Sequence, residues 1–406
     1  MLAQDLKKNY DSTSLGAHVW FVVLFLALAG VVVDAQTLPP GQQVQRPRRV
    51  MPPPEKEYPG EELSENDVVR VDTQLITVPV VVRDQHGQPI TGLKASDFQV
   101  YEDNQPQSLA TFATSDAPFE VALLLDTSGS TRAGIALIRS AAYAFIESLR
   151  PGDRVAVLSF NTIEERRERI AKVAVQSYLT NDREALRGAV QNIGASSGTP
   201  YYDALECVAK EIFREPPIPE RRGRRALVAL TDGVDSASRS DFASVRAHFL
   251  QAGALTYFIQ IDTEDYVGKG LLRDCQDDGA LRLSSTQLEL YRRTFDPRAA
   301  RANYADFCLM NPFKRLEISG SLYQLARKEM AQLARDTGGR IFEAADLHAA
   351  RTAFAAVAAD IGRQYSLGYY STNKARDGRF RQIRVEVRGL AGAKVSAREG
   401  YQPTNL

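Results

Sequence analysis

A short polar stretch directly follows a run of apolar residues in the first half of the chain. The run is Val121–Leu125, and the stretch is Asp126-Thr127-Ser128-Gly129-Ser130. A carboxylate and two hydroxyls on a glycine-containing loop have three interpretations. They can form an ordinary turn, a nucleophile that handles phosphate, or part of a metal site. The choice between these depends on what other segments supply.

Two more loops carry oxygen donors. Ser197-Gly198-Thr199-Pro200 precedes an expected helix, and Thr231-Asp232-Gly233 follows an expected strand. Each loop alone is explained by a helix N-cap or a turn. Taken together, the three loops offer only oxygen ligands, which suit Mg²⁺ or Mn²⁺. The candidate metal ligands are Asp126, Ser128, Ser130, Thr199 and Asp232.

The elements that position these loops alternate between strand and helix. The continuous apolar run Val121–Leu125 is typical of a central parallel strand covered on both faces. The alternation predicts an α/β fold with a doubly wound, mostly parallel sheet, in which ligands bind at the carboxyl ends of the strands. The other expected strands are 155–160, 173–179 (a short edge strand), 226–230, 255–261 and 340–342, and the expected helices are 135–149, 182–193, 202–213, 241–252, 322–336 and 347–361.

The pattern Asp126-x-Ser128-x-Ser130, then Thr199, then Asp232 resembles the metal-ion-dependent adhesion site of von Willebrand factor type A domains. The resemblance extends over about residues 119–361. The flanking segments LKASDFQVYEDNQPQ and QYSLGYY…AREGYQPT resemble a bacterial exported group called VWFA-related, common in acidobacteria. The resemblance implies a Rossmann-like sheet. It also implies that the three hydroxyls contact the metal directly and that the two aspartates often act through water.

The charge of this ligand set explains the function that the resemblance implies. Two carboxylates only balance a divalent cation, so the ion can accept an anionic oxygen from outside. We therefore expect a non-enzymatic protein that binds a partner's Asp or Glu carboxylate through the metal. Two alternatives stay open: a scaffold in which the metal only orders the loops, and an assembly factor for another envelope protein.

Catalysis has little support in the sequence. A phosphotransferase would need a second carboxylate at position 128, which is serine. A serine hydrolase would need a G-x-S-x-G elbow and a histidine, and an ATPase would need a GxxxxGK[ST] loop. The segment Gly194-Ala195-Ser196-Ser197-Gly198 has the G-x-S-x-G spacing, but none of the four histidines is evidently poised for chemistry, and the GxxxxGK[ST] loop does not occur.

The remaining segments divide the chain into five parts. Residues 1–35 resemble a signal peptide cleaved after Ala35, although an uncleaved anchor is the alternative. The protein is thus expected to be exported, and to meet a membrane only through an uncleaved signal. Residues 36–66 are expected to form a Pro/Gln-rich disordered linker. Residues 67–116 and 363–406 are β-rich, and we expect them to form one small β-sandwich around the α/β domain, residues 117–362. Pro79 suggests that its strand is an edge strand or has a bulge.

Composition limits the partners. The formal net charge is +0, which argues against nucleic acid or an anionic membrane as the partner. The basic cluster Arg221–Arg225 is interpreted as a solvated loop ahead of a strand.

One insertion, residues 263–320, interrupts the alternation and is expected to be irregular. It should border the metal face and modulate specificity. Two of its residues, Cys275 and Cys308, could pair, whereas Cys207 is expected to be a buried free thiol. Near the same rim, Asp235, Ser236 and Asp262 are either supporting groups or plain surface turns.

Overall fold

The computed structural model describes residues 75–114, 118–129, 131, 134–165, 168–215, 224–275, 277 and 281–403. The predicted signal peptide and linker, and the candidate ligand Ser130, lie outside these residues. The chain divides into two units, and all of the described residues lie in the second one, Arg70–Leu406. All that follows concerns the second unit.

The centre of the fold is a six-stranded sheet with the order β10-β9-β8-β5-β6-β7. Every residue of β5 and β8 is buried, as the apolar runs predicted. Five strands are parallel, and β7 pairs antiparallel with β6 at one edge. The strands are β5 (Glu120–Leu125), β6 (Arg154–Glu165), β7 (Glu168–Thr180), β8 (Arg225–Thr231), β9 (Leu255–Ile261) and β10 (Arg340–Ala344).

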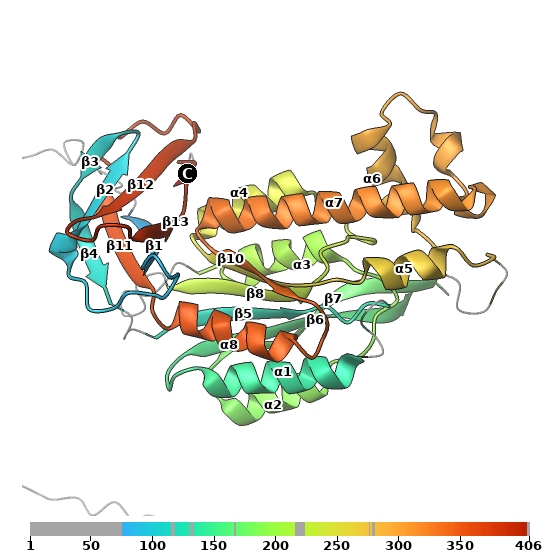
Figure 1. Ribbon diagram of the computed structural model, residues 1–406, viewed down its shortest axis with the longest axis horizontal. Coiled ribbons are helices and arrows are strands. Elements are labelled where there is room, and N and C mark those ends of the chain that lie inside the picture. The colour runs from blue at the N-terminus through green and yellow to red at the C-terminus, as the bar shows by residue number, and fades with distance from the viewer. Residues whose placement is uncertain are drawn as a thin grey trace, which may run out of the picture. The chain divides into compact units, whose positions relative to one another are not determined.

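Helices cover both faces of this sheet (Figure 1). Two separate apolar cores result, one on each face, so the predicted fold class is confirmed. One face carries α1 (Ile135–Ser148), α2 (Arg183–Gln191) and α8 (Ala350–Ile361). The other carries α3 (Tyr201–Cys207), which continues as a π-helical turn η4 (Val208–Ile212), with α4 (Phe242–Ala252) and α7 (Pro312–Thr337).

Strands from the two ends of the described chain complete two antiparallel four-stranded sheets. Their orders are β13-β1-β11-β4 and β14-β12-β2-β3. Strand β1 pairs with β11 and β13, and β2 pairs with β12, so each sheet mixes both segments. One apolar core lies between the sheets, as expected for a β-sandwich. The strands are β1 (Leu75–Arg83), β2 (Phe98–Glu102), β3 (Gln105–Gln107), β4 (Leu109–Ala113), β11 (Tyr365–Tyr370), β12 (Arg381–Val387), β13 (Lys394–Ala397) and β14 (Gly400–Tyr401), and a 3₁₀ turn η2 (Ala95–Asp97) precedes β2.

Pro79 does not mark an edge strand or a bulge. Strand β1 lies inside its sheet, and its register with β11 is regular through Pro79, which faces Ser366. The other neighbour, β13, begins to pair only at Val80. Proline lacks an N–H group, and it is tolerated here because only one side of the strand is paired at that residue.

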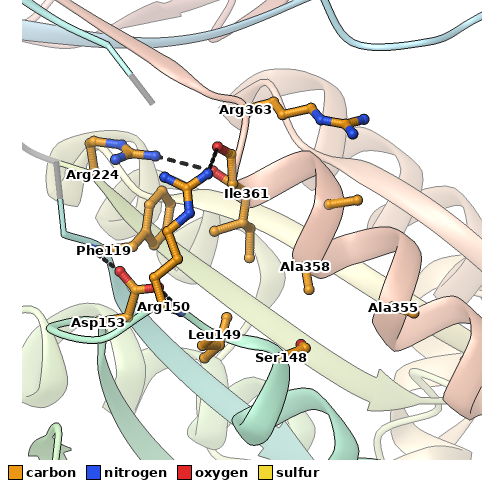
Figure 2. Close-up of a pocket in the computed structure, with 12 residues that line it drawn as sticks. Phe119, Ser148, Leu149, Arg150, Asp153, Arg224, Ala355, Ala358, Ile361 and Arg363 are labelled. Atoms are coloured by element: carbon orange, nitrogen blue, oxygen red, sulfur yellow. Dashed lines mark hydrogen bonds between the residues drawn. The ribbon is translucent and has the colours of Figure 1, made fainter. Parts of the chain in front are cut away.

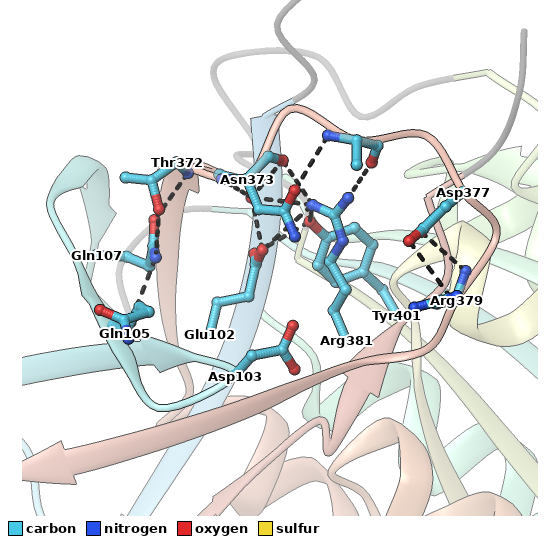
Figure 3. A network of polar contacts seen from close by, with 12 residues as sticks. Glu102, Asp103, Gln105, Gln107, Thr372, Asn373, Asp377, Arg379, Arg381 and Tyr401 are labelled. Carbon is cyan, nitrogen blue, oxygen red and sulfur yellow. Dashed lines mark hydrogen bonds and ion pairs between the residues drawn. The ribbon is translucent and has the colours of Figure 1, made fainter.

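A buried polar network ties the sandwich together on one side (Figure 3). The Glu102 carboxylate accepts hydrogen bonds from the Tyr369 hydroxyl at 2.7 Å and the Tyr401 hydroxyl at 3.0 Å. The Arg381 guanidinium lies 3.3 Å from the same carboxylate and also donates to the carbonyl of Asn373. A buried carboxylate needs such partners, so this network is structural.

The insertion is helical, which corrects the expectation of an irregular segment. It contains α5 (Glu264–Leu271) and α6 (Ser285–Phe295), with 3₁₀ turns η5 (Arg301–Tyr304) and η6 (Phe307–Leu309), and α7 already begins at Pro312. A disulfide joins Cys275 to Cys308. Apolar side chains of these helices form a separate small core, so the insertion packs as a unit of its own.

The basic cluster does not lie in a solvated loop where it is described. Arg224 and Arg225 are buried, which corrects that interpretation. Arg225 begins β8 and forms an ion pair with Glu120, while Arg224 stacks on Phe119 with 5.0 Å between guanidinium and ring centroid. Figure 2 shows Arg224 and Arg150 beside the last turn of α8, where they donate to the carbonyls of Ile361 and Gly362. Cations are favoured at a helix C-terminus, so the cavity beside these residues is explained by capping.

Cys207 is a free thiol, as predicted, but it is half-buried rather than buried. No helix among the described residues is long and apolar enough to cross a membrane. The apolar run near the N-terminus lies outside that search.

Candidate functional site

The candidate ligands follow two neighbouring strands. β5 and β8 are adjacent and parallel, so their carboxyl ends lie at one edge of the sheet. Asp126 directly follows β5 and Asp232 directly follows β8, and the Asp126 amide donates to the carbonyl of Leu230 at 2.9 Å. The loop that contains Thr199 is joined to the first loop, because the Ser196 amide donates to the carbonyl of Thr127 at 2.8 Å. The three loops therefore meet.

Asp126 lies at the bottom of the site and is 0% exposed. Its Oδ1 accepts from the Ser128 amide at 3.0 Å, and its Oδ2 accepts from Thr231 Oγ1 at 2.7 Å. Burial, and then the charge of Asp232, raise the pKa of Asp126 to about 7, against the opposing effect of these hydrogen bonds. The carboxylate is thus held by neutral donors while a second carboxylate repels it.

Asp232 is held in a similar way. Its Oδ1 accepts from the Val234 amide at 3.0 Å, and its Oδ2 accepts from Thr263 Oγ1 at 2.6 Å. The Tyr323 hydroxyl lies 2.7 Å from the same Thr263 oxygen. Thr263 follows β9 and Tyr323 belongs to α7, so the surroundings of Asp232 include the start of the insertion and the helix that ends it.

The Thr199 loop is fixed by the residues that follow Asp232. Ser236 and Thr199 exchange two hydrogen bonds: the Thr199 amide donates to Ser236 Oγ at 2.8 Å, and the Ser236 amide donates to the Thr199 carbonyl at 2.9 Å. Asp235 is buried and accepts from the Tyr201 amide at the start of α3. Asp235 and Ser236 are therefore supporting groups, whereas Asp262 is an exposed turn residue that accepts from the Glu264 amide.

Ser128, Thr199 and Asp232 line one cavity of about 130 Å³, and Asp126 is buried beside it. No group of three or more His, Cys, Asp or Glu side chains within the described parts of the chain is arranged to hold a metal. The donors here are two carboxylates and neutral hydroxyls, which is a different kind of set. Two buried carboxylates that repel each other, with hydroxyls beside them, fit a hard divalent cation, because such an ion removes the repulsion.

Sequence reasoning missed the residues that hold the two aspartates. Thr231 directly precedes Asp232, and Thr263 follows the end of the next strand, so both lie at the edge that the sheet order implies. Tyr323 lies within the helix that the sequence predicted from residue 322, but nothing local marks it as a neighbour of the site. Its contact with Thr263 depends on how α7 packs.

Comparisons with known proteins give one family match and several distant structural likenesses. Residues 121–234 match the family model of the von Willebrand factor type A domain. A solved structure described as von Willebrand factor type A from Catenulispora acidiphila shares 13% identity at a TM-score of 0.38, over 82% of this chain and 74% of that one. No curated protein matches the sequence.

Two further solved structures are similar over parts of the chain. Proximal thread matrix protein 1 from the mussel byssus has 11% identity and a TM-score of 0.37, over 70% of this chain and 50% of that one. The vWF domain of the type V pili tip protein Mfa5 from Porphyromonas gingivalis has 19% identity and a TM-score of 0.24, over 30% and 40%. The chain thus spans half or less of the length of these two. Such distant likenesses carry no functional conclusion. The family model, in contrast, covers β5 with the polar loop that follows it, and β8 with Asp232. Residues 121–234 belong to the von Willebrand factor type A domain family.

Proposed function

We propose that this protein binds a partner protein through a divalent cation, Mg²⁺ or Mn²⁺, held by the five predicted ligands. The ion would be held by Asp126, Ser128, Ser130, Thr199 and Asp232. The observation that carries the proposal is that Ser128, Thr199 and Asp232 line one cavity beside the buried Asp126. Three separate segments of the chain thus bring oxygen donors to one place.

The charge of the site indicates what it binds. Two carboxylates balance the charge of a divalent cation, and the hydroxyl ligands are neutral. An oxygen from outside can then complete its coordination, and an anionic oxygen is the strongest candidate. An Asp or Glu side chain of another protein supplies such an oxygen, so metal-dependent adhesion or protein–protein binding follows. We assign no catalytic role to these residues.

The predicted signal peptide, residues 1–35 with cleavage after Ala35, supports export to the periplasm, the envelope or the medium. Export would place the binding site where it meets other envelope proteins. An assembly factor for such a protein would use the same metal chemistry. The other candidate is a scaffold in which the ion only orders the three loops, and the hydrogen bonds that already join these loops keep that candidate open.

Calorimetric titration with Mg²⁺ tests the metal site, with Thr199→Val as the main variant. Valine keeps the shape of threonine but removes the hydroxyl, so Mg²⁺ affinity should fall by at least about tenfold. Thr294→Val is the matched control, because Thr294 is exposed on α6 and outside the cavity. An unchanged affinity in Thr199→Val, or no Mg²⁺ binding by the native protein, would refute the assignment.

The melting temperature separates adhesion from scaffolding. Retention on immobilised acidic peptides in the presence of Mg²⁺, lost with EDTA, measures binding. Adhesion predicts that Thr199→Val loses retention while its melting temperature without metal stays that of the native protein. A large drop in the melting temperature together with a native level of retention would favour the scaffold instead.

A further inference from the structure

The helical insertion forms one wall of the candidate metal site. The cavity lined by Ser128, Thr199 and Asp232 is also lined by residues of α5, of the segment before α6, of α6 and of α7. Among these residues is Arg282, whose side chain is exposed. The insertion therefore supplies part of the surface that a group in the cavity meets.

Arg282 is held in place by its neighbours. Leu283 belongs to the small core of the insertion, and Ser284 caps α6 by accepting from the Gln287 amide. Ser284 Oγ also donates to the carbonyl of Ser236 at 2.7 Å, and Ser236 is the residue that is hydrogen-bonded to Thr199. The segment that carries Arg282 is thus fixed to the loop that carries a candidate ligand.

The guanidinium of Arg282 is anchored but retains donors. One of its nitrogens donates to the carbonyl of Cys275, which the disulfide joins to Cys308. No acidic side chain among the described residues forms an ion pair with it. A guanidinium has five N–H groups in a planar fork, so most of them stay available to another acceptor.

Arg282 and Asp232 are the charged side chains among the described residues that line this cavity. Arg282 thus brings a positive charge to the lining of the cavity to which we assign a cation, and this charge disfavours the metal alone. An anion that binds between the two positive groups makes the arrangement more favourable. A carboxylate has two oxygens and can contact both.

We propose that Arg282 determines specificity by donating to the second oxygen of an acidic side chain whose first oxygen contacts the metal. This inference rests on the proposed function and names its ligand chemistry. An amide has one acceptor oxygen, so when that oxygen contacts the metal, its NH2 group, which is a donor, faces the N–H donors of Arg282. Charge-assisted hydrogen bonds from arginine to carboxylate are strong and directional, and the two-point contact selects Glu or Asp over Gln or Asn.

The test uses a short peptide with one internal Glu, acetylated and amidated at its ends, and its Gln counterpart. Binding is measured on the full chain loaded with Mn²⁺, by paramagnetic broadening of the peptide's proton resonances. Arg282→Ala should weaken binding of the Glu peptide by on the order of tenfold. The same change should leave Mg²⁺ affinity without peptide unchanged or higher, because a neighbouring positive charge has been removed. A merely structural residue would instead lower both the peptide affinity and the Mg²⁺ affinity.

Three variants control the charge, the anchoring contact and the location. Arg282→Lys keeps the charge but loses the fork, so its affinity should be intermediate. Arg282→Gln removes the charge while its amide can still donate to the Cys275 carbonyl, so it should bind as weakly as Arg282→Ala. Arg298→Ala removes the same charge from an exposed position of the insertion and should behave as the native protein.

The outcomes separate this inference from the proposed function. If Arg282→Gln binds the Glu peptide with native affinity and still binds Mg²⁺, the role of Arg282 is overturned. The proposed function then stands. Absence of metal-dependent peptide binding in the native protein overturns both. Two further ligands carry a carboxylate from another source. A Gln peptide with a free C-terminus offers a chain-terminal carboxylate, and glutarate offers a small dicarboxylate. Stronger binding of either than of the internal Glu peptide overturns the assignment to an acidic side chain.

Discussion

At the scale of single residues, the two aspartates of the candidate site are held by hydroxyls and amides. Thr231 donates to Asp126, and Thr263 donates to Asp232. A neutral donor fixes the orientation of a carboxylate without cancelling its charge, and residues in such a position tune metal affinity. A lysine or arginine in the same place would compete with a cation. The threonines therefore leave both charges available to an ion.

Removal of the Thr231 hydroxyl should affect both stability and metal binding. In Thr231→Val the buried Asp126 loses its donor at 2.7 Å, and the Gly233 amide loses the acceptor that it contacts at 2.9 Å. Unsatisfied buried polar groups cost about 1–3 kcal/mol each, so the free energy of unfolding in urea should fall by at least about 1 kcal/mol. Mg²⁺ affinity measured by calorimetry should fall by about 10- to 100-fold.

The matched control for this change is Thr352→Val, because Thr352 is exposed on α8. That variant should unfold within about 0.5 kcal/mol of the native protein and bind Mg²⁺ equally well. If Thr231→Val also matched the native protein in both measurements, the hydroxyl would not hold Asp126.

Sequence reasoning found the candidate ligands more readily than the residues around them. Asp126 and Asp232 are conspicuous because each ends an apolar run, and the parallel sheet brings such ends together. Thr231 and Thr263 have no such mark, since a threonine at a strand end is common. Nothing in the sequence marks Arg282, because its position at the cavity depends on how the insertion folds.

At the scale of elements, the insertion is where the sequence was least informative. Its helices are short and carry many charges, so their apolar spacing is weak. The signals that exist are local: Ser284 and Gln287 form a capping box for α6, and Asn311 caps α7 with Pro312 in its first turn. The apolar side chains of α5 and α6 face a small core separate from those of the large sheet, which the strand–helix alternation cannot reveal.

The disulfide should determine how well the insertion keeps its position. Cys275→Ser with Cys308→Ser removes a crosslink between residues that are 33 apart in sequence. Loop-closure entropy for that separation predicts a loss of about 3–4 kcal/mol, and less if the insertion unfolds locally. Because the Cys275 carbonyl anchors Arg282, binding of the Glu peptide should weaken while Mg²⁺ affinity stays close to the native value.

Cys207→Ser is the control, since Cys207 is a free thiol of α3, outside the insertion, and forms no disulfide. Peptide binding and Mg²⁺ affinity should both be native in this variant. Native peptide affinity in the double cysteine variant would show that the position of Arg282 does not depend on the crosslink.

At the scale of the whole unit, the β-sandwich depends on both flanking segments. Each segment alone has too few strands for a stable core, and this reasoning predicted that they combine. Pairing of β1 with β11 and of β2 with β12 confirms it. The contacts that join the sandwich to the α/β part could not be predicted, because they depend on single buried arginines. Arg83 of β1 forms an ion pair with Asp360 of α8, and Arg398 donates to the carbonyl of Leu250 in α4.

Loss of one partner from the Arg83–Asp360 pair should destabilise the whole unit. Both side chains are buried, and removal of one leaves an uncompensated charge, which costs about 3–5 kcal/mol. The loss of stability in Arg83→Met should lie toward the lower end of this range, because Arg340 Nη1 still lies 3.6 Å from the Asp360 carboxylate. The double variant Arg83→Met with Asp360→Leu should recover most of that loss, since no buried charge is then left unpaired. Urea denaturation measures both, with Arg351→Met, an exposed position on α8, as the control. A single variant as stable as that control would mean that the sandwich and the α/β part are not joined through this ion pair.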